Sequence, residues 1–191
     1  MEQKDTQYYE DFENNLMTKL LGQLTSLQAL DGTLLDSDDI TARWHDLAPE
    51  YMADAVPQIN SYPAAAIAWA AYVGMAVAHR WDEDWILYST EPYTDLLGPR
   101  GFDDMDEYIV QNILGLTLDS PEAKQIMNIL LCCAQKAVNF IRHEHIEAQT
   151  AKAFHIFART AKVMFRTGAA LQLRQLGYKF QKVDINRRLP S

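Results

Sequence analysis

Residues Pro63–Trp85, PAAAIAWAAYVGMAVAHRWDEDW, join a long apolar run to a charged end, and this stretch decides the fold. The apolar run from Pro63 to Ala78 is 16 residues long. As a helix with a rise of about 1.5 Å per residue it would span roughly 24 Å, whereas the core of a bilayer needs about 30 Å. A helix that is apolar on all sides is normally buried by other parts of the protein. The stretch therefore predicts a central core helix and not a membrane span.

Small residues recur once per turn along this helix and leave a groove with few side-chain atoms: Ala66, Ala70, Gly74 and Ala78. A second helix can approach the backbone closely along such a groove. The neighbouring row of side chains ends at His79, one helical turn before Glu83. Because core packing is the commoner reason for such rows, we interpret His79 as a residue at the rim of the core beside an acid.

Further helices are predicted before the central one. An apolar stripe at three- and four-residue steps runs from Tyr9 to Leu27. Ser37 is a candidate N-cap of a second helix, and Pro49 is expected to end that helix or to open another short one. After the central helix, the Gly- and Pro-containing residues 92–101 form a loop that leads to a shorter helix over about 105–116.

Ser120-Pro121-Glu122 is a strong helix start, and no glycine or proline follows until Gly168. This interval is too long for a typical helix, so we place a turn or a kink in the polar run Arg142–Thr150. The segment could then be one kinked helix or two separate helices. No segment shows strand-like alternation. The prediction is an all-α, single-domain bundle of about five to seven mostly antiparallel helices over residues 1–177, followed by a basic tail, residues 178–191, that need not be ordered.

The two cysteines, Cys132 and Cys133, are neighbours in an apolar helical stretch. Buried thiols are commoner there than a strained disulfide, and they fit a reducing compartment. The N-terminal residues lack the apolar core of a secretory signal. We therefore expect a cytoplasmic protein.

The charges are distributed unevenly along the chain, which has a net charge of −9. Residues 1–120 carry 22 acidic against five basic residues, whereas residues 121–191 carry four acidic against twelve basic ones. Basic side chains fall on one face of the predicted last helix: Lys152, His155, Arg159, Lys162 and Arg166.

This basic face is a candidate binding surface for an anion or a partner. The simplest interpretation is a face that is solvated or paired within the chain, followed by an acidic partner or a second subunit. Nucleic acid is disfavoured because a chain with this net negative charge repels a polyanion.

Two His-x-x-x-Glu pairs, His79 with Glu83 and His143 with Glu147, each place an imidazole and a carboxylate on one helical face. If their helices meet, the four side chains could hold a divalent transition metal. Such pairs are often only surface ion pairs, so the leading expectation is no cofactor, with the metal site as the alternative.

Motifs for nucleotide binding, serine hydrolysis and thiol redox chemistry are absent, and no catalytic residue can be named. The leading hypothesis is a non-enzymatic protein that acts through self-association or a protein partner. The alternative is a bundle enzyme or binding protein with a metal or a small anionic ligand near His79 and Glu83 together with His143 and Glu147.

Overall fold

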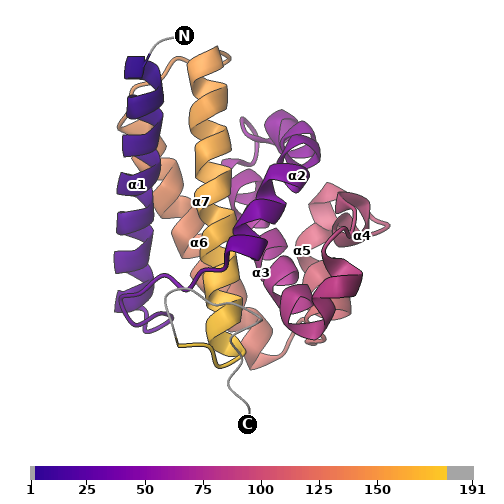
Figure 1. Ribbon diagram of the computed structural model, residues 1–191. Coiled ribbons are helices and arrows are strands. Elements are labelled where there is room, and N and C mark those ends of the chain that lie inside the picture. The colour runs from indigo at the N-terminus through magenta and orange to yellow at the C-terminus, as the bar shows by residue number, and fades with distance from the viewer. Residues whose placement is uncertain (1–2, 180–191) are drawn as a thin grey trace.

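The computed structural model describes residues 3–179 of the 191-residue chain, and these residues form an all-α bundle, which confirms the predicted fold class. Figure 1 shows the arrangement of the helices. The α-helices are α1 (Gln3–Ser26), α2 (Asp38–Ala55), α3 (Pro63–Tyr88), α4 (Tyr93–Leu97), α5 (Met105–Tyr108), α6 (Pro121–Arg142) and α7 (Ala151–Gln175). Short helical turns are η1 (Val56–Gln58), η2 (Phe102–Asp104) and the π-helical η3 (Ile109–Ile113). The predicted basic tail lies, from residue 180 on, outside the described residues.

Three of the long helices run in one direction and two in the other. Ile67 and Ile156, in the N-terminal parts of α3 and α7, line one cavity. Further along the two helices, His79 lies 3.5 Å from Gln172, so α3 and α7 are parallel. Helix α1 runs parallel to α7, whereas α2 and α6 are antiparallel to their neighbours α3 and α1 (Figure 1).

Helices α3 and α7 form the centre of the bundle because their backbones touch. Gly74 of α3 faces the carbonyl of Phe165, and Gly168 of α7 faces the carbonyl of Ala71. A Cβ atom at either glycine would overlap the facing backbone. The predicted groove of small residues is therefore the contact surface, and Ala66, Ala70 and Ala78 on the same row are fully buried.

The predicted turn between residues 142 and 150 separates two helices. Helix α6 ends at Arg142, and Thr150 caps α7 by accepting a hydrogen bond from the Ala153 N–H at 3.1 Å. At the other end of α6, Ser120 accepts from the Ala123 N–H at 3.2 Å, as expected for an N-cap. The alternative of one kinked helix is thus excluded.

One prediction about helix boundaries was wrong. Pro49 lies inside α2 and does not end it, because the buried side chains on both sides, including Leu47 and Tyr51, hold both halves of the helix against the core. Helix α3 continues to Tyr88, with a kink at Asp84, whose carboxylate accepts a hydrogen bond from the Leu87 N–H at 3.1 Å and so caps the last turn.

Among residues 3–179, none of the helices combines the length and apolar character needed to cross a bilayer.

Candidate functional site

The basic face of α7 lies against α1. The Arg159 guanidinium is 2.7 Å from one carboxylate oxygen of Glu13, and the Lys162 ammonium is 2.9 Å from the other. Burial of Glu13 opposes its ionisation, but the hydrogen bonds and charges of Arg159 and Lys162 outweigh burial and lower the pKa of this carboxyl. One acidic side chain of α1 therefore pairs with two members of the basic face.

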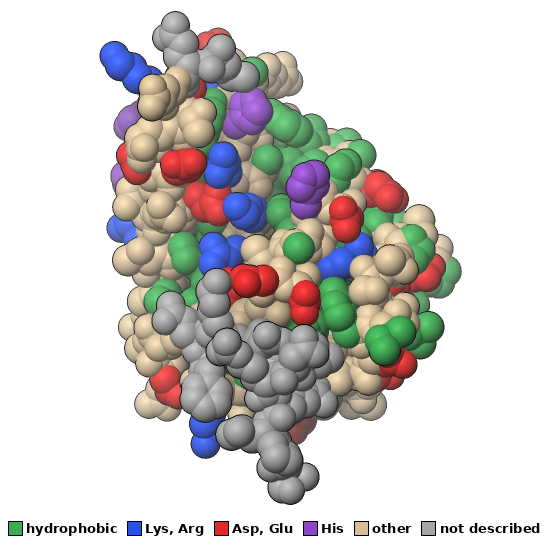
Figure 2. Space-filling model, in the orientation of Figure 1, with side chains coloured by type: hydrophobic (Ala, Val, Ile, Leu, Met, Phe, Trp, Pro, Cys, Tyr) green, Lys and Arg blue, Asp and Glu red, His purple; other side chains and the backbone are tan. Residues whose placement is uncertain are grey.

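The other three members also have partners within the chain. Arg166 lies 3.5 Å from Asp36, Lys152 lies 4.5 Å from the centre of the Tyr8 ring, and the rings of His155 and Tyr9 are 5.2 Å apart. Figure 2 shows Lys and Arg side chains in a column over α7 with acidic side chains beside them. All five residues predicted for anion or partner binding thus contact α1 or the loop that follows it.

The two His-x-x-x-Glu pairs lie at opposite ends of α3. His143 follows the end of α6, where Ile141 and Arg142 line a cavity together with Pro63 and Ile67 from the start of α3. His79 is twelve residues beyond Ile67, a distance of about 18 Å along the helix. The four side chains therefore do not converge, and within residues 3–179 no three His, Cys, Asp or Glu side chains are grouped so that they could hold a metal ion.

Each histidine of these pairs has its own partners. The His79 ring is 3.5 Å from the Gln172 amide and 4.0 Å from the Glu83 carboxylate. The Nδ1 atom of His143 is 2.7 Å from the carbonyl oxygen of Asn139, one turn earlier in α6, whereas Glu147 is exposed.

The two cysteines are both free thiols in different surroundings: Cys132 is exposed and Cys133 is buried. Burial raises the pKa of the Cys133 thiol to about 12. A thiol with this pKa is protonated at neutral pH and is a poor nucleophile.

A half-buried ion cluster that sequence reasoning missed joins α2, α3 and the loop before α4. Arg43 donates a hydrogen bond to the carbonyl oxygen of Glu91, and Arg80 lies 3.4 Å from the Glu91 carboxylate. Burial raises the pKa of Glu91, and this effect is larger than the lowering of the pKa by the charges of Arg80 and Arg43. Arg43 and Glu91 are 48 positions apart in the chain, so no local spacing could have predicted their contact.

An apolar cavity of about 670 Å³ lies at the end of the bundle where α6 ends and α7 begins. We call it the end cavity. Its lining comes from η1 and the following turn, from the starts of α3 and α7, from the end of α6 and from the α6–α7 loop. The lining residues are Val56, Ile59, Asn60, Pro63, Ile67, Val138, Ile141, Arg142, Ile146, Ala148, Gln149, Thr150, Ala153, Phe154, Ile156 and Phe157.

The end cavity is open to solvent, and apolar side chains remain exposed at its edge. Phe154 is 48% and Val56 38% exposed, although both are large hydrophobic residues. In Figure 2, hydrophobic side chains gather beside the first part of α7 and over the end of α2. Cavities of 300–1,000 Å³ with mainly apolar linings are typical of small-molecule binding sites.

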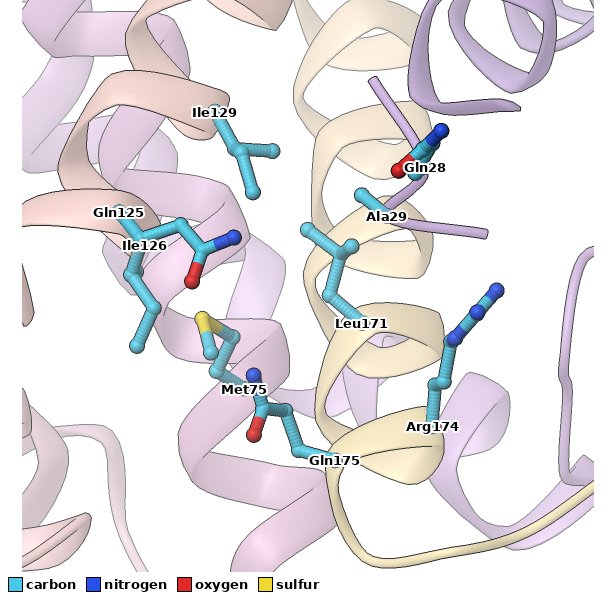
Figure 3. Close-up of a pocket in the computed structure, with 9 residues that line it drawn as sticks. All are labelled: Gln28, Ala29, Met75, Gln125, Ile126, Ile129, Leu171, Arg174 and Gln175. Atoms are coloured by element: carbon cyan, nitrogen blue, oxygen red, sulfur yellow. The ribbon is translucent and has the colours of Figure 1, made fainter. Parts of the chain in front are cut away.

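A smaller cavity of about 310 Å³ lies between α3, α6 and α7 (Figure 3). The amides of Gln125 and Gln175 point toward each other across it, with Met75 between them, whereas Arg174 points away. Arg174 lies 2.9 Å from Asp31 in an ion pair. This cavity has a mixed polar lining and no charged group directed into it, so it is a weaker candidate site than the end cavity.

No protein-family model, no curated protein and no solved structure matches this chain.

Proposed function

We propose that the protein is a non-catalytic binding protein and that the end cavity holds the apolar part of a small ligand. The observation that carries this proposal is the size and apolar lining of the end cavity. A ligand that covers Phe154 and Val56 would remove exposed apolar surface from water, which stabilises a complex by about 25 cal/mol per Å². The described residues that line the end cavity do not include a nucleophile together with a base and a group that orients the base. We therefore favour binding over catalysis.

The proposal is tested with the neutral, apolar fluorophore N-phenyl-1-naphthylamine. We expect its fluorescence to rise on binding to the native protein, with saturation at one probe per chain. Ala153 lines the end cavity, so Ala153→Trp should fill part of the space and abolish saturable binding. The matched control is Ala42→Trp, at an exposed position near the start of α2, which should leave binding unchanged. Equal binding by both variants, or none by the wild type, would contradict the proposal.

Self-association is a second candidate function, favoured by the outer face of α6. Between Lys124 and Arg142 the exposed side chains of α6 are all uncharged, and Met127 and Leu131 are 51% and 43% exposed. An exposed helical face without charges is unusual on a monomer and can pack against a second copy.

Sedimentation velocity over a range of protein concentrations tests this candidate. A dimer should form in the wild type and be lost in Leu131→Lys, which adds a charge to the centre of the face. Lys124→Gln, at the edge of the face, is the control. A wild type that stays monomeric at all concentrations would remove this candidate and leave the end cavity as the site.

A further inference from the structure

We infer that the ligand of the end cavity is a linear alkyl carboxylate, with its chain among the apolar side chains and its carboxylate on Arg142. This inference rests on the proposed function and specifies the chemistry of the ligand. Among the described residues that line the cavity, Arg142 is the only charged one, and none of them is acidic. The cavity therefore favours an amphiphile with one negative charge over a neutral or a cationic one.

Arg142 differs from the other arginines that the structure describes. Six of them form ion pairs with carboxylates: Arg43, Arg80, Arg100, Arg159, Arg166 and Arg174. Within residues 3–179, Arg142 makes neither an ion pair nor a hydrogen bond through its side chain. Its guanidinium can therefore take a ligand carboxylate without breaking an existing contact, and the planar fork of a guanidinium matches the two oxygens of a carboxylate.

Further hydrogen-bond donors line the same cavity as Arg142. The side-chain amides of Asn60 and Gln149 belong to the lining and can donate to an anion. The backbone at Gln149 has a φ of 64°, and His145 in the same loop has a φ of 51°, a conformation that non-glycine residues rarely adopt.

The surrounding contacts hold this unfavourable backbone in place. The Thr150 hydroxyl donates to the Glu147 carbonyl at 2.8 Å and accepts from the Ala153 N–H at 3.1 Å, so the loop is fixed to the start of α7 on both sides of Gln149. Unfavourable backbone conformations that are held by their surroundings are frequent at ligand sites.

The test measures binding of alkyl carboxylates of increasing chain length by isothermal titration calorimetry, below their micelle concentrations. Each added methylene should tighten binding about fourfold until the cavity is filled, since burial of one methylene contributes about 0.8 kcal/mol. Decanoate should bind at least about fivefold more tightly than decan-1-ol and decylamine, because only the carboxylate pairs with Arg142.

Two variants identify the residue that holds the carboxylate. Arg142→Gln should weaken decanoate binding at least about fivefold and leave decan-1-ol binding unchanged. Arg100→Gln is the matched control, because Arg100 is an exposed arginine of the α4–α5 region that does not line the end cavity.

The outcomes separate this inference from the proposed function. Equal binding of decanoate and decan-1-ol, with no effect of Arg142→Gln, would overturn the inference and leave the apolar site standing. Failure of decanoate, decan-1-ol and N-phenyl-1-naphthylamine alike would overturn both. Binding to anionic phospholipid vesicles without binding of free decanoate would assign the apolar surface to a membrane and also overturn the inference.

Discussion

Gly74 and Gly168 form a reciprocal backbone contact between the two central helices. A Cβ atom on Gly74 would overlap the Phe165 carbonyl oxygen and lie 2.9 Å from the Ala169 nitrogen. A Cβ atom on Gly168 would overlap the Ala71 carbonyl and lie 2.8 Å from the Ala71 Cα. Each glycine therefore allows the backbone of the other helix to approach, and a parallel helix pair joined by more than sixty residues depends on both.

We predict that Gly74→Leu and Gly168→Ala each lower the free energy of unfolding by roughly 1–3 kcal/mol or more, because the helices must separate to admit the new atoms. Urea denaturation followed by circular dichroism measures the change. Gly22→Ala is the control, since nothing lies within 4 Å of a Cβ at Gly22 in α1. This control should be neutral or stabilising by about 0.5–1 kcal/mol, as alanine is the better helix former. Unchanged denaturation midpoints for both test variants would show that the contact is not tight.

The sequence predicted those parts of the fold that depend on residues close together in the chain. The small-residue row around Gly74 marked the close helix contact, and Ser120-Pro121 marked the start of α6, because glycine spacing and capping act within a few residues. Pro49 was misleading, since its local preference was overridden by packing of the residues around it.

The candidate sites were less predictable for the same physical reason. The basic face of α7 was visible in the sequence, but its pairing with Glu13 joins residues 146 positions apart. The end cavity is formed by segments that are distant in the chain, and no periodicity links Ile59 to Ile141 or Phe154. Spacing could identify the His79 and His143 pairs but not that they lie at opposite ends of α3.

The two adjacent cysteines should differ sharply in reactivity. Cys132 is exposed, whereas Cys133 is buried and its pKa is raised to about 12. At pH 8, a thiol reagent such as 5,5′-dithiobis(2-nitrobenzoic acid) should modify one cysteine of the native protein rapidly and both in denaturant. Cys132→Ser should abolish the rapid phase and Cys133→Ser should retain it. Rapid modification of two thiols in the native protein would contradict the described burial of Cys133.

Glu13 should make the bundle sensitive to acid. Its pKa is lowered in the folded state by Arg159 and Lys162 from the ordinary value of 4.5. A carboxyl with a lowered pKa contributes stability that is complete above its unfolded pKa and is lost as the pH falls through its folded pKa. The contribution of Glu13 should therefore be full above about pH 4.5 and decline below it.

Glu13→Gln tests this contribution. At pH 7 the variant should lose about 1–3 kcal/mol of stability, less than for a fully buried pair because Arg159 and Lys162 are each about one-third exposed. The difference from the wild type should shrink as the pH is lowered below 4.5, measured by urea denaturation at each pH. A difference that stays constant with pH would show that Glu13 is not held as a charged group.

Glu91 should behave in the opposite way, although it also lies beside two arginines. Its pKa is raised because burial outweighs the charges of Arg80 and Arg43, so the folded protein holds the neutral form more firmly than the unfolded chain does. A carboxyl with a raised pKa costs stability while it is ionised, and this cost is relieved as the pH falls through the raised value. Glu91→Gln is neutral at every pH and should therefore match or exceed the wild type at pH 7, within about 1 kcal/mol.

The backbone contact from Arg43 to the Glu91 carbonyl is independent of the Glu91 side chain and should survive this substitution. Glu107→Gln, which removes an exposed pair with Arg100, is the control for loss of a carboxylate and should change stability by no more than about 0.5 kcal/mol. A loss of about 3 kcal/mol or more in Glu91→Gln would mean that Arg80 and Arg43 favour the ionised carboxylate by more than burial disfavours it. The cluster would then hold α2 and α3 together through charge. In that case Glu91→Gln, like Glu13→Gln, would be less stable than the wild type at pH 7.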